Sequence, residues 1–187
     1  MMMKEISLHV LDIIQNSIAA QATLIEIEVE VRHEKDWMRV SVRDNGCGMD
    51  EEFLKIVVSP FTTSRTTRKV GLGIPMFKAG AEAAGGAFQI QSEPGKGTFI
   101  QAEYQISHWD RPPLGDMAGT IYATVICNEQ TDIVYNFEVD GNTFRFDTRE
   151  IKAALGEGIP LHMPDVAAWI KEFITEGIDA LNGGIEI

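Results

Sequence analysis

The segment from Arg43 to Met49 places the carboxylate of Asp44 at the end of a strand-like stretch and follows it with two glycines, Gly46 and Gly48. A carboxylate at such a position can accept a hydrogen bond from an exocyclic amine, and glycines let the backbone approach a flat ring where a Cβ would collide. Asp44 is therefore a candidate for recognising adenine. The letters Asp-Asn-Gly are also a common turn signal, so the interpretation depends on neighbouring motifs.

Two more polar residues, Asp12 and Asn16, lie four apart on a predicted helix. We expect Ser7 to cap this helix. Apolar residues recur at three- and four-residue steps and predict its buried face: Leu8, Leu11, Ile14 and Ile18. Residues four apart share one side of a helix, so Asp12 and Asn16 can point into the same cleft. The alternative is that both simply face water.

A polar stretch without periodicity, residues 59–70, predicts a loop. Its three basic residues, Arg65, Arg68 and Lys69, stand out in an acidic chain and suggest a lid over a triphosphate. The alternative is an ordinary solvated loop.

A helix is predicted to follow this loop, opened by Gly71 and Gly73 and ending near Ala84. The free amides at a helix N-terminus suit phosphate. Further on, residues 93–97 predict a turn between two strands, and the alternative is an ordinary hairpin without a binding role.

Taken in order, these motifs resemble the ATP site of the GHKL superfamily, which includes gyrase B, heat-shock chaperones, histidine kinases and MutL. Residues 16–23 and 43–48 resemble MutL. The later motifs resemble the catalytic domain of sensor histidine kinases: residues 60–63, 71–74, 85–86 and 92–98. The resemblance covers roughly residues 5–106.

The resemblance implies an α/β sandwich, the Bergerat fold, with a mixed, mostly antiparallel sheet and helices on one face, and it implies binding of ATP with Mg²⁺. By the same likeness Asp44 selects adenine, Asn16 holds the magnesium, and Asp12 stands where many members have a water-activating glutamate. Thr98 would lie behind the adenine. The nucleotide-binding residues implied in this way are Asn16, Ala20, Asp44, Gly46, Gly48, Met49, Thr62, Arg65, Arg68, Lys69, Gly71, Leu72, Gly73, Ile74 and Thr98.

Three positions depart from the pattern of this superfamily. Asp12 is one methylene shorter than glutamate, which predicts slow hydrolysis. Lys69 replaces the usual first glycine of the second glycine motif, so it either stiffens the lid hinge or contacts phosphate itself. Ala19 stands where MutL-type proteins usually have an aspartate near the adenine pocket.

Alternating apolar and charged residues predict an antiparallel hairpin over residues 24–44, and two more strands are expected at 87–92 and 98–106. We expect residues 1–107 to form the ATP-binding domain. After a proline-rich break, residues 115–187 are expected to form a small α+β extension of unknown role.

Within the extension, strands are predicted at residues 120–127, 133–139 and 143–146. A helix capped by Asp147 or Thr148 is predicted to run to about Leu155, and a second helix is predicted to start at Pro164. Its apolar stripe, which includes Trp169 and Phe173, is expected to pack on the sheet. The alternative is that these two aromatic residues dock a partner or a second copy.

Composition limits the classes of function. A chain of 187 residues, 44% of them hydrophobic, can build a core, and its formal charge of −12 would repel a phosphate backbone, so nucleic acid is not expected as a partner. Cys47 and Cys127 are expected to be reduced thiols of a cytoplasmic protein. No apolar run has the length of a membrane span.

Three functions follow from these expectations. The chain is either a protein kinase-type phosphotransferase that regulates a partner protein, or a slow ATPase switch, or a nucleotide-sensing module similar to anti-sigma factors. No dimerising hairpin with a phosphoacceptor histidine is expected before the domain, and His9 is interpreted as a surface or core residue. A homodimer is possible.

Overall fold

The computed structural model describes residues 5–58, 73–156 and 158–182, so the predicted lid lies outside the described residues. The elements are α1 (Ile6–Ala19), β1 (Leu24–Arg32), η1 (His33–Lys35), β2 (Trp37–Asp44), α2 (Glu51–Val58), α3 (Gly73–Ala83), β3 (Phe88–Glu93), β4 (Gly97–Gln105), α4 (Met117–Cys127), β5 (Asp132–Val139), β6 (Asn142–Asp147), α5 (Thr148–Leu155) and α6 (Pro164–Asn182).

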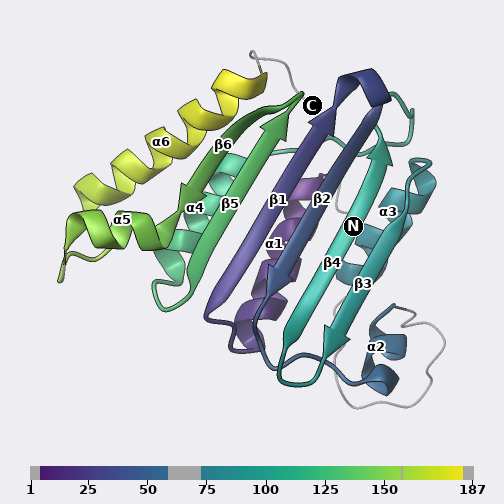
Figure 1. The fold of residues 1–187 in the computed structure, drawn as a ribbon, viewed down its shortest axis with the longest axis horizontal. Helices are drawn as coiled ribbons and strands as arrows, with labels where there is room; N and C mark the ends of the chain where they lie inside the picture. Colours follow the sequence, from purple (N-terminus) through teal and green to yellow (C-terminus); the bar gives the residue numbers. More distant parts are fainter. Residues whose placement is uncertain (1–4, 59–72, 157, 183–187) are drawn as a thin grey trace.

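The strands form one six-stranded sheet in the order β3-β4-β2-β1-β5-β6 (Figure 1). In the described part of the chain, neighbouring strands are antiparallel except for β1 and β5, which run parallel. A parallel neighbour requires a crossover connection, and α4 lies in the connection between β4 and β5. The C-terminal strands therefore extend the same sheet, and Asp132 N donates to Thr23 O at 2.8 Å where β5 begins.

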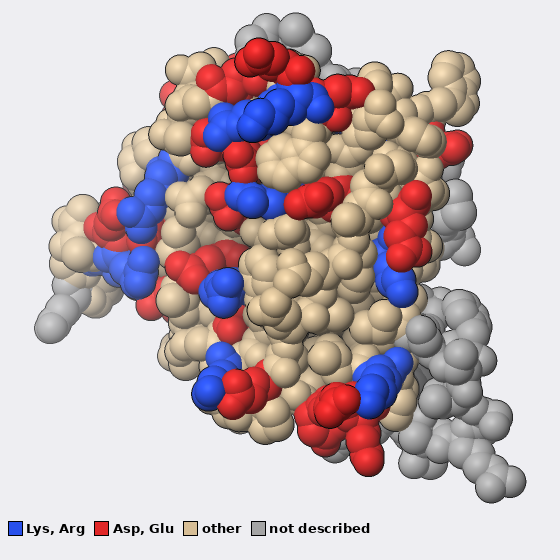
Figure 2. All heavy atoms as spheres, turned by 45° about the vertical axis from the view of Figure 1, so that its right-hand side comes forward, with Lys and Arg blue, Asp and Glu red and all other residues tan. Residues whose placement is uncertain are grey.

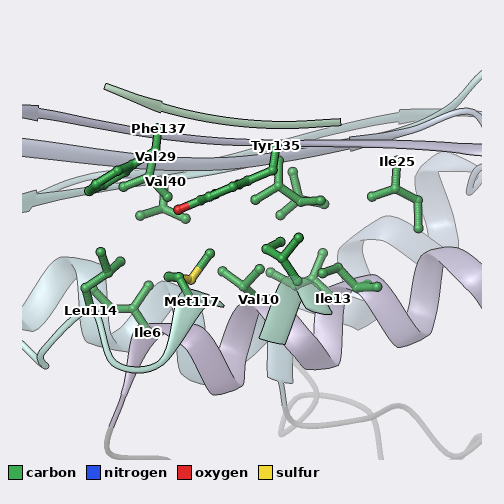
Figure 3. Close-up of a cluster of buried hydrophobic side chains, with 14 of the residues drawn as sticks. Ile6, Val10, Ile13, Ile25, Val29, Val40, Leu114, Met117, Tyr135 and Phe137 are labelled. Atoms are coloured by element: carbon green, nitrogen blue, oxygen red, sulfur yellow. The ribbon is translucent and has the colours of Figure 1, made fainter. Parts of the chain in front are cut away.

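The helices cover one face of the sheet, and the apolar core fills the space between the two layers (Figure 3). The apolar strand residues, which alternate with charged ones, point into this core, and apolar side chains of α1 and α4 form its other side. Labelled core residues are Ile6, Val10, Ile13, Ile25, Val29, Val40, Leu114, Met117, Tyr135 and Phe137. The predicted mixed sheet with helices on one face is confirmed.

The opposite face of the sheet carries the charged half of the alternation. Arg32 pairs with Glu30 at 2.9 Å and also with Glu138, and Arg39 pairs with Glu30 across β1 and β2. Figure 2 shows basic side chains beside acidic ones around a largely uncharged centre. On the face shown, the positive charges are thus interspersed with negative ones and do not gather into a basic patch.

The strand predicted at residues 120–127 is wrong, because this stretch is the helix α4. Its β-branched residues suggested a strand, but Asp116 caps the helix by accepting from Gly119 N at 2.7 Å. The buried hydroxyl of Thr124 donates to Thr120 O at 2.8 Å, so it needs no other partner.

The start of α1 also differs from the prediction. The N-cap residue is Glu5, without a side-chain cap, and Ser7 is buried in the first turn. The carbonyls of Pro113 and Leu114 accept from Ile6 N and Ser7 N at 3.0 and 2.9 Å, so a distant segment satisfies these helix amides. The buried face of α1 also differs from the predicted one, because Leu8 is exposed while Ile6, Val10 and Ile13 are buried.

The remaining helices of the extension agree with expectation. Asp147 caps α5 by accepting from Arg149 N at 3.0 Å, and its guanidinium partners hold the pKa of this carboxyl below its usual range. The helix α6 begins at Pro164. Among the helices of the described ranges, none is long and apolar enough to cross a bilayer.

Candidate functional site

A cavity of about 510 Å³ opens between α1, α2, the start of α3, the end of β2 and the start of β4. This volume lies in the range of small-molecule sites. Its lining is mostly apolar with a few polar groups, and consists of Ile13, Asn16, Ser17, Ala19, Ala20, Asp44, Cys47, Gly48, Met49, Asp50, Phe53, Val57, Ile74, Thr98 and Ile100.

Asp44 is held in the cavity wall by hydrogen bonds to both carboxylate oxygens. Its Oδ1 accepts from Gly46 N at 2.8 Å and from Thr98 N at 3.3 Å, and its Oδ2 accepts from Ser17 Oγ at 2.7 Å. A carboxylate offers about four acceptor positions. Oδ2, with one bond, therefore keeps the capacity to accept from an amine in the cavity, whereas Oδ1 is already occupied by two amides.

Asn45, the residue after Asp44, explains why the sequence Asp-Asn-Gly is also typical of a turn. Asn45 Oδ1 accepts from Thr23 N at 2.9 Å and from Leu24 N at 3.0 Å, and Asn45 Nδ2 donates to Thr23 Oγ1 at 2.8 Å. This side chain ties the end of β2 to the start of β1. In Asp-Asn-Gly the asparagine thus builds the turn, and the aspartate is left to face the cavity.

The glycines of this turn allow close backbone contacts. A Cβ at Gly46 would lie 2.9 Å from Ala20 Cβ. Gly48 has φ +67°, and a Cβ there would lie 2.0 Å from the carbonyl oxygen of Glu93, so no other residue fits. Next to it, Met49 N donates to Ser92 Oγ at 2.8 Å. The turn after β2 and the turn between β3 and β4 therefore support each other.

Gly97, in the turn between β3 and β4, lies in close contact with the backbone of Asp44. Its φ is +99°, and a Cβ would lie 2.0 Å from the backbone oxygen of Asp44. We expect Gly97→Ala to destabilise the fold by at least about 3 kcal/mol, because backbone cannot yield as a flexible side chain does. Gly95→Ala is the matched control, since its φ is +77° but no described residue lies within 4 Å of the added Cβ, and about 1 kcal/mol of strain is expected. Thermal unfolding of both variants measures the difference, and equal losses would contradict the contact.

The two polar residues of α1 lie in different surroundings. Asn16 lines the cavity, with an exposed side chain. Asp12 is not among the lining residues, and its carboxylate packs against Gly73 at the start of α3, where an added Cβ would lie 1.6 Å from Asp12 Oδ2. Gly73 is thus needed for Asp12 to hold this position.

His9, one turn before Asp12, is a core residue. It is buried against Phe77 of α3, with ring centroids 5.8 Å apart. Burial lowers its pKa, and the Asp12 carboxylate opposes this shift only in part. Its Nδ1 has no hydrogen-bond partner among the described residues. The interpretation that His9 is a surface or core residue is consistent with this position.

The cavity brings together about half of the nucleotide-binding residues predicted from the sequence: Asn16, Ala20, Asp44, Gly48, Met49, Ile74 and Thr98. Gly46 contacts the wall residues Ala20 and Asp44, and Gly73 contacts Asp12. The others lie outside the described residues: Thr62, Arg65, Arg68, Lys69, Gly71 and Leu72.

Sequence reasoning missed Ser17, which is buried and donates to Asp44. A signal was present, because Ile13, Asn16, Ser17 and Ala20 follow the i, i+3, i+4, i+7 spacing of one helix face. It also missed the apolar wall opposite, whose residues belong to α2 and β4: Phe53, Val57 and Ile100.

Magnesium would need ligands beyond those of the protein. Within the described ranges no group of three histidine, cysteine or carboxylate side chains could hold a metal ion. Mg²⁺ commonly takes only one or two protein oxygens and completes its shell with water and substrate phosphates. The exposed amide of Asn16 in the cavity wall fits that role, with Asp12 one helical turn away.

A family model described as histidine kinase-, DNA gyrase B- and HSP90-like ATPase matches residues 4–108, and the chain belongs to this family of ATPase domains. The match includes α1, the Asp44 turn and the β3–β4 turn. The six-stranded sandwich is the Bergerat fold that the sequence predicts.

Curated relatives include sensor kinases and a mismatch-repair protein. Sensor protein kinase FleS of Pseudomonas aeruginosa is 40% identical over 89 residues, which are 48% of this chain and 22% of FleS. The sensory kinase SasA of Prochlorococcus marinus is 29% identical over 107 residues, covering 54% of this chain and 27% of SasA. MutL of Kosmotoga olearia is 41% identical over 54 residues, covering 29% of this chain and 8% of MutL. The chain thus matches only a minor part of each of these proteins.

Among solved structures, the N-terminal domain of a DNA repair protein superposes with a TM-score of 0.55 at 14% sequence identity. The superposition covers 77% of this chain and 52% of the other, so it extends past residue 108 into the C-terminal part. At this identity the likeness concerns the fold alone.

Proposed function

We propose that this protein binds Mg-ATP in the cavity and transfers the terminal phosphoryl group to a regulatory partner protein. The observation that supports this most directly is the geometry of Asp44, whose Oδ2 accepts from Ser17 and can still accept from the adenine amine, while Oδ1 is fixed by two backbone amides. Asn16 on the same wall would hold the magnesium. The phosphates would be contacted by Arg65, Arg68 and Lys69.

In this reaction the bond between the γ-phosphorus and the β–γ bridging oxygen breaks, and a nucleophile of the partner forms a new bond to the phosphorus. ADP leaves with the bridging oxygen, and the nucleophile loses its proton to a base. Phosphoryl transfer depends mainly on positioning and charge stabilisation, so the chain needs little covalent chemistry of its own. The likeness to the sensor kinases FleS and SasA supports a protein as acceptor.

A slow ATPase or a pure nucleotide sensor is the second candidate, and one observation favours it. The carboxylate of Asp12 packs against Gly73, and this contact limits its use as a base for an attacking water or for an acceptor on the partner. In that case the C-terminal part of the chain would read out the bound nucleotide. With either function we propose a cytoplasmic location, because Cys47 and Cys127 are free thiols, as expected in a reducing compartment.

The test follows the γ-phosphate of labelled Mg-ATP with purified protein, wild type beside Asp12→Asn, each with and without lysate of the source cells. For a kinase we expect label on a lysate protein and little free phosphate. If Asp12 is the base of a self-sufficient ATPase, phosphate release by the pure protein falls by about 100-fold in Asp12→Asn, which contradicts the kinase proposal. Label that stays on ATP in every tube despite tight binding identifies a sensor. Titration of ATP into both proteins shows that binding is intact.

A further inference from the structure

The strand β6 is an open edge of the sheet. It pairs only with β5 among the described strands, through a two-residue turn at Asp140 and Gly141, whose φ values are +48° and +91°. Such a turn makes Val139 and Asn142 a hydrogen-bonded pair, and the pairs then alternate. The backbone amides and carbonyls of Thr143 and Arg145 therefore point away from β5, toward solvent.

An aromatic shelf, formed by Trp169 and Phe173 of α6, lies next to this edge. The two rings stack with centroids 5.1 Å apart, and Phe173 also contacts Phe144 of β6 at 5.4 Å. Trp169 is 49% exposed and Phe173 is 38% exposed. Figure 1 shows α6 beside β6, past the edge of the sheet, and because Phe173 contacts Phe144, a seventh strand added at β6 would lie next to the shelf.

The shelf is flanked by acidic residues. Glu172 and Glu176 are exposed and lie three residues after Trp169 and Phe173, and Asp165 lies four residues before Trp169, so all three share or border the aromatic face of the helix. Arg145 alternates with the inward-facing Phe144 and Phe146 and pairs with Asp147 at 2.6 Å. An incoming segment with basic ends would match this charge pattern.

We propose that β6 and the aromatic shelf bind one extended segment of another protein, which adds a strand to the sheet, places apolar side chains on Trp169 and Phe173 and places lysine or arginine beside Glu172 and Glu176. Backbone hydrogen bonds to an open edge, combined with alternate side-chain pockets, are a common form of peptide recognition. A single segment fits better than a second copy, because two copies paired through β6 would both bring α6 into the space just past the shared edge.

The probe is a capped peptide, Lys-Thr-Val-Thr-Val-Thr-Lys, in which the valines and lysines share one face of a strand, titrated against the full chain and followed by calorimetry. Two control peptides replace the lysines by glutamate or the central threonine by proline. We expect saturable binding of the lysine peptide with a Kd on the order of 10 μM, and binding at least about tenfold weaker for both controls. Failure of the lysine peptide to bind at about 1 mM would overturn the proposal.

Arg145→Pro and Arg145→Ala separate the backbone edge from the side chain. Proline removes an outward amide without breaking a bond to β5, so we expect it to weaken binding at least about tenfold, whereas alanine changes binding by less than about threefold. Thr143→Pro removes the other outward amide and serves if Arg145→Pro does not fold, as judged by circular dichroism. Equal affinities for the proline and alanine variants would overturn the strand geometry.

Charge reversal tests the acidic flank. In Glu172→Lys/Glu176→Lys we expect the lysine peptide to bind at least about tenfold more weakly and the glutamate peptide to gain. Glu82→Lys on α3 is the remote charge control and should leave both affinities unchanged. Sedimentation measures the oligomeric state of the wild type and of Arg145→Pro. A dimer that is lost in Arg145→Pro would show that a second copy pairs with the β6 edge, which contradicts the proposal.

Discussion

Asp44→Asn is expected to weaken ATP binding by at least about 100-fold, or about 2.7 kcal/mol. The two backbone amides from Gly46 and Thr98 require an acceptor at the Oδ1 position, so they fix the asparagine oxygen there. The new NH₂ group then occupies the place of Oδ2 and presents a donor to the adenine amine, which is also a donor. Ser17 can turn its hydroxyl to accept, so the fold should persist.

Calorimetric titration of Mg-ATP measures this loss, and Asp50→Asn is the matched control. Asp50 also lines the cavity, and its Oδ1 accepts from Phe53 N at 2.7 Å at the start of α2. Asparagine serves as well at that position, so the control loses the same charge from the same cavity and should change affinity by less than about threefold. Wild-type affinity in Asp44→Asn would remove Asp44 from the adenine site.

The sequence predicted those features that depend on neighbouring residues. Apolar and polar residues alternate along β1 and β2, so the hairpin that leads to Asp44 could be predicted from the local sequence. The Asp44 turn, the helix after Gly73 and the β3–β4 turn each have their own local signal. Their order along the chain then placed them at a single site.

Features that depend on distant contacts were not accessible in this way. Thr120 and Val125 have strand propensity, but α4 forms because it can pack against α1 and α6. The carbonyls of Pro113 and Leu114 replace a cap on α1, and more than 100 residues separate them from the helix amides that they accept from. The parallel pairing of β5 with β1 likewise has no signal in either strand alone.

The position of Asp12 shows the same limit at the level of one side chain. Helical spacing placed Asp12 on the same side as Asn16, and only the packing of α3 against α1 determines that its carboxylate meets Gly73. The sequence showed that Asp12 is one methylene group shorter than glutamate, but it did not show that the Asp12 carboxylate contacts Gly73. Both features affect whether Asp12 can activate water.

Asn16→Ala is expected to remove the magnesium dependence of ATP binding. In wild type we expect Mg²⁺ to raise ATP affinity at least about tenfold, because one protein oxygen joins phosphates and water in its shell. Alanine removes that oxygen, so the affinities with and without Mg²⁺ should agree within about twofold. The fold should be retained, because Asn16 is exposed and alanine favours helix.

Gln15→Ala is the matched control for this experiment, since Gln15 is the neighbouring exposed amide on α1 and does not line the cavity. It should keep the full response to Mg²⁺. Titrations of both variants in Mg²⁺ and in chelator, with circular dichroism alongside, distinguish the possible results. An unfolded Asn16→Ala would mean that the residue supports helix packing, and a folded variant with an unchanged Mg²⁺ response would place the metal ligand elsewhere in the cavity.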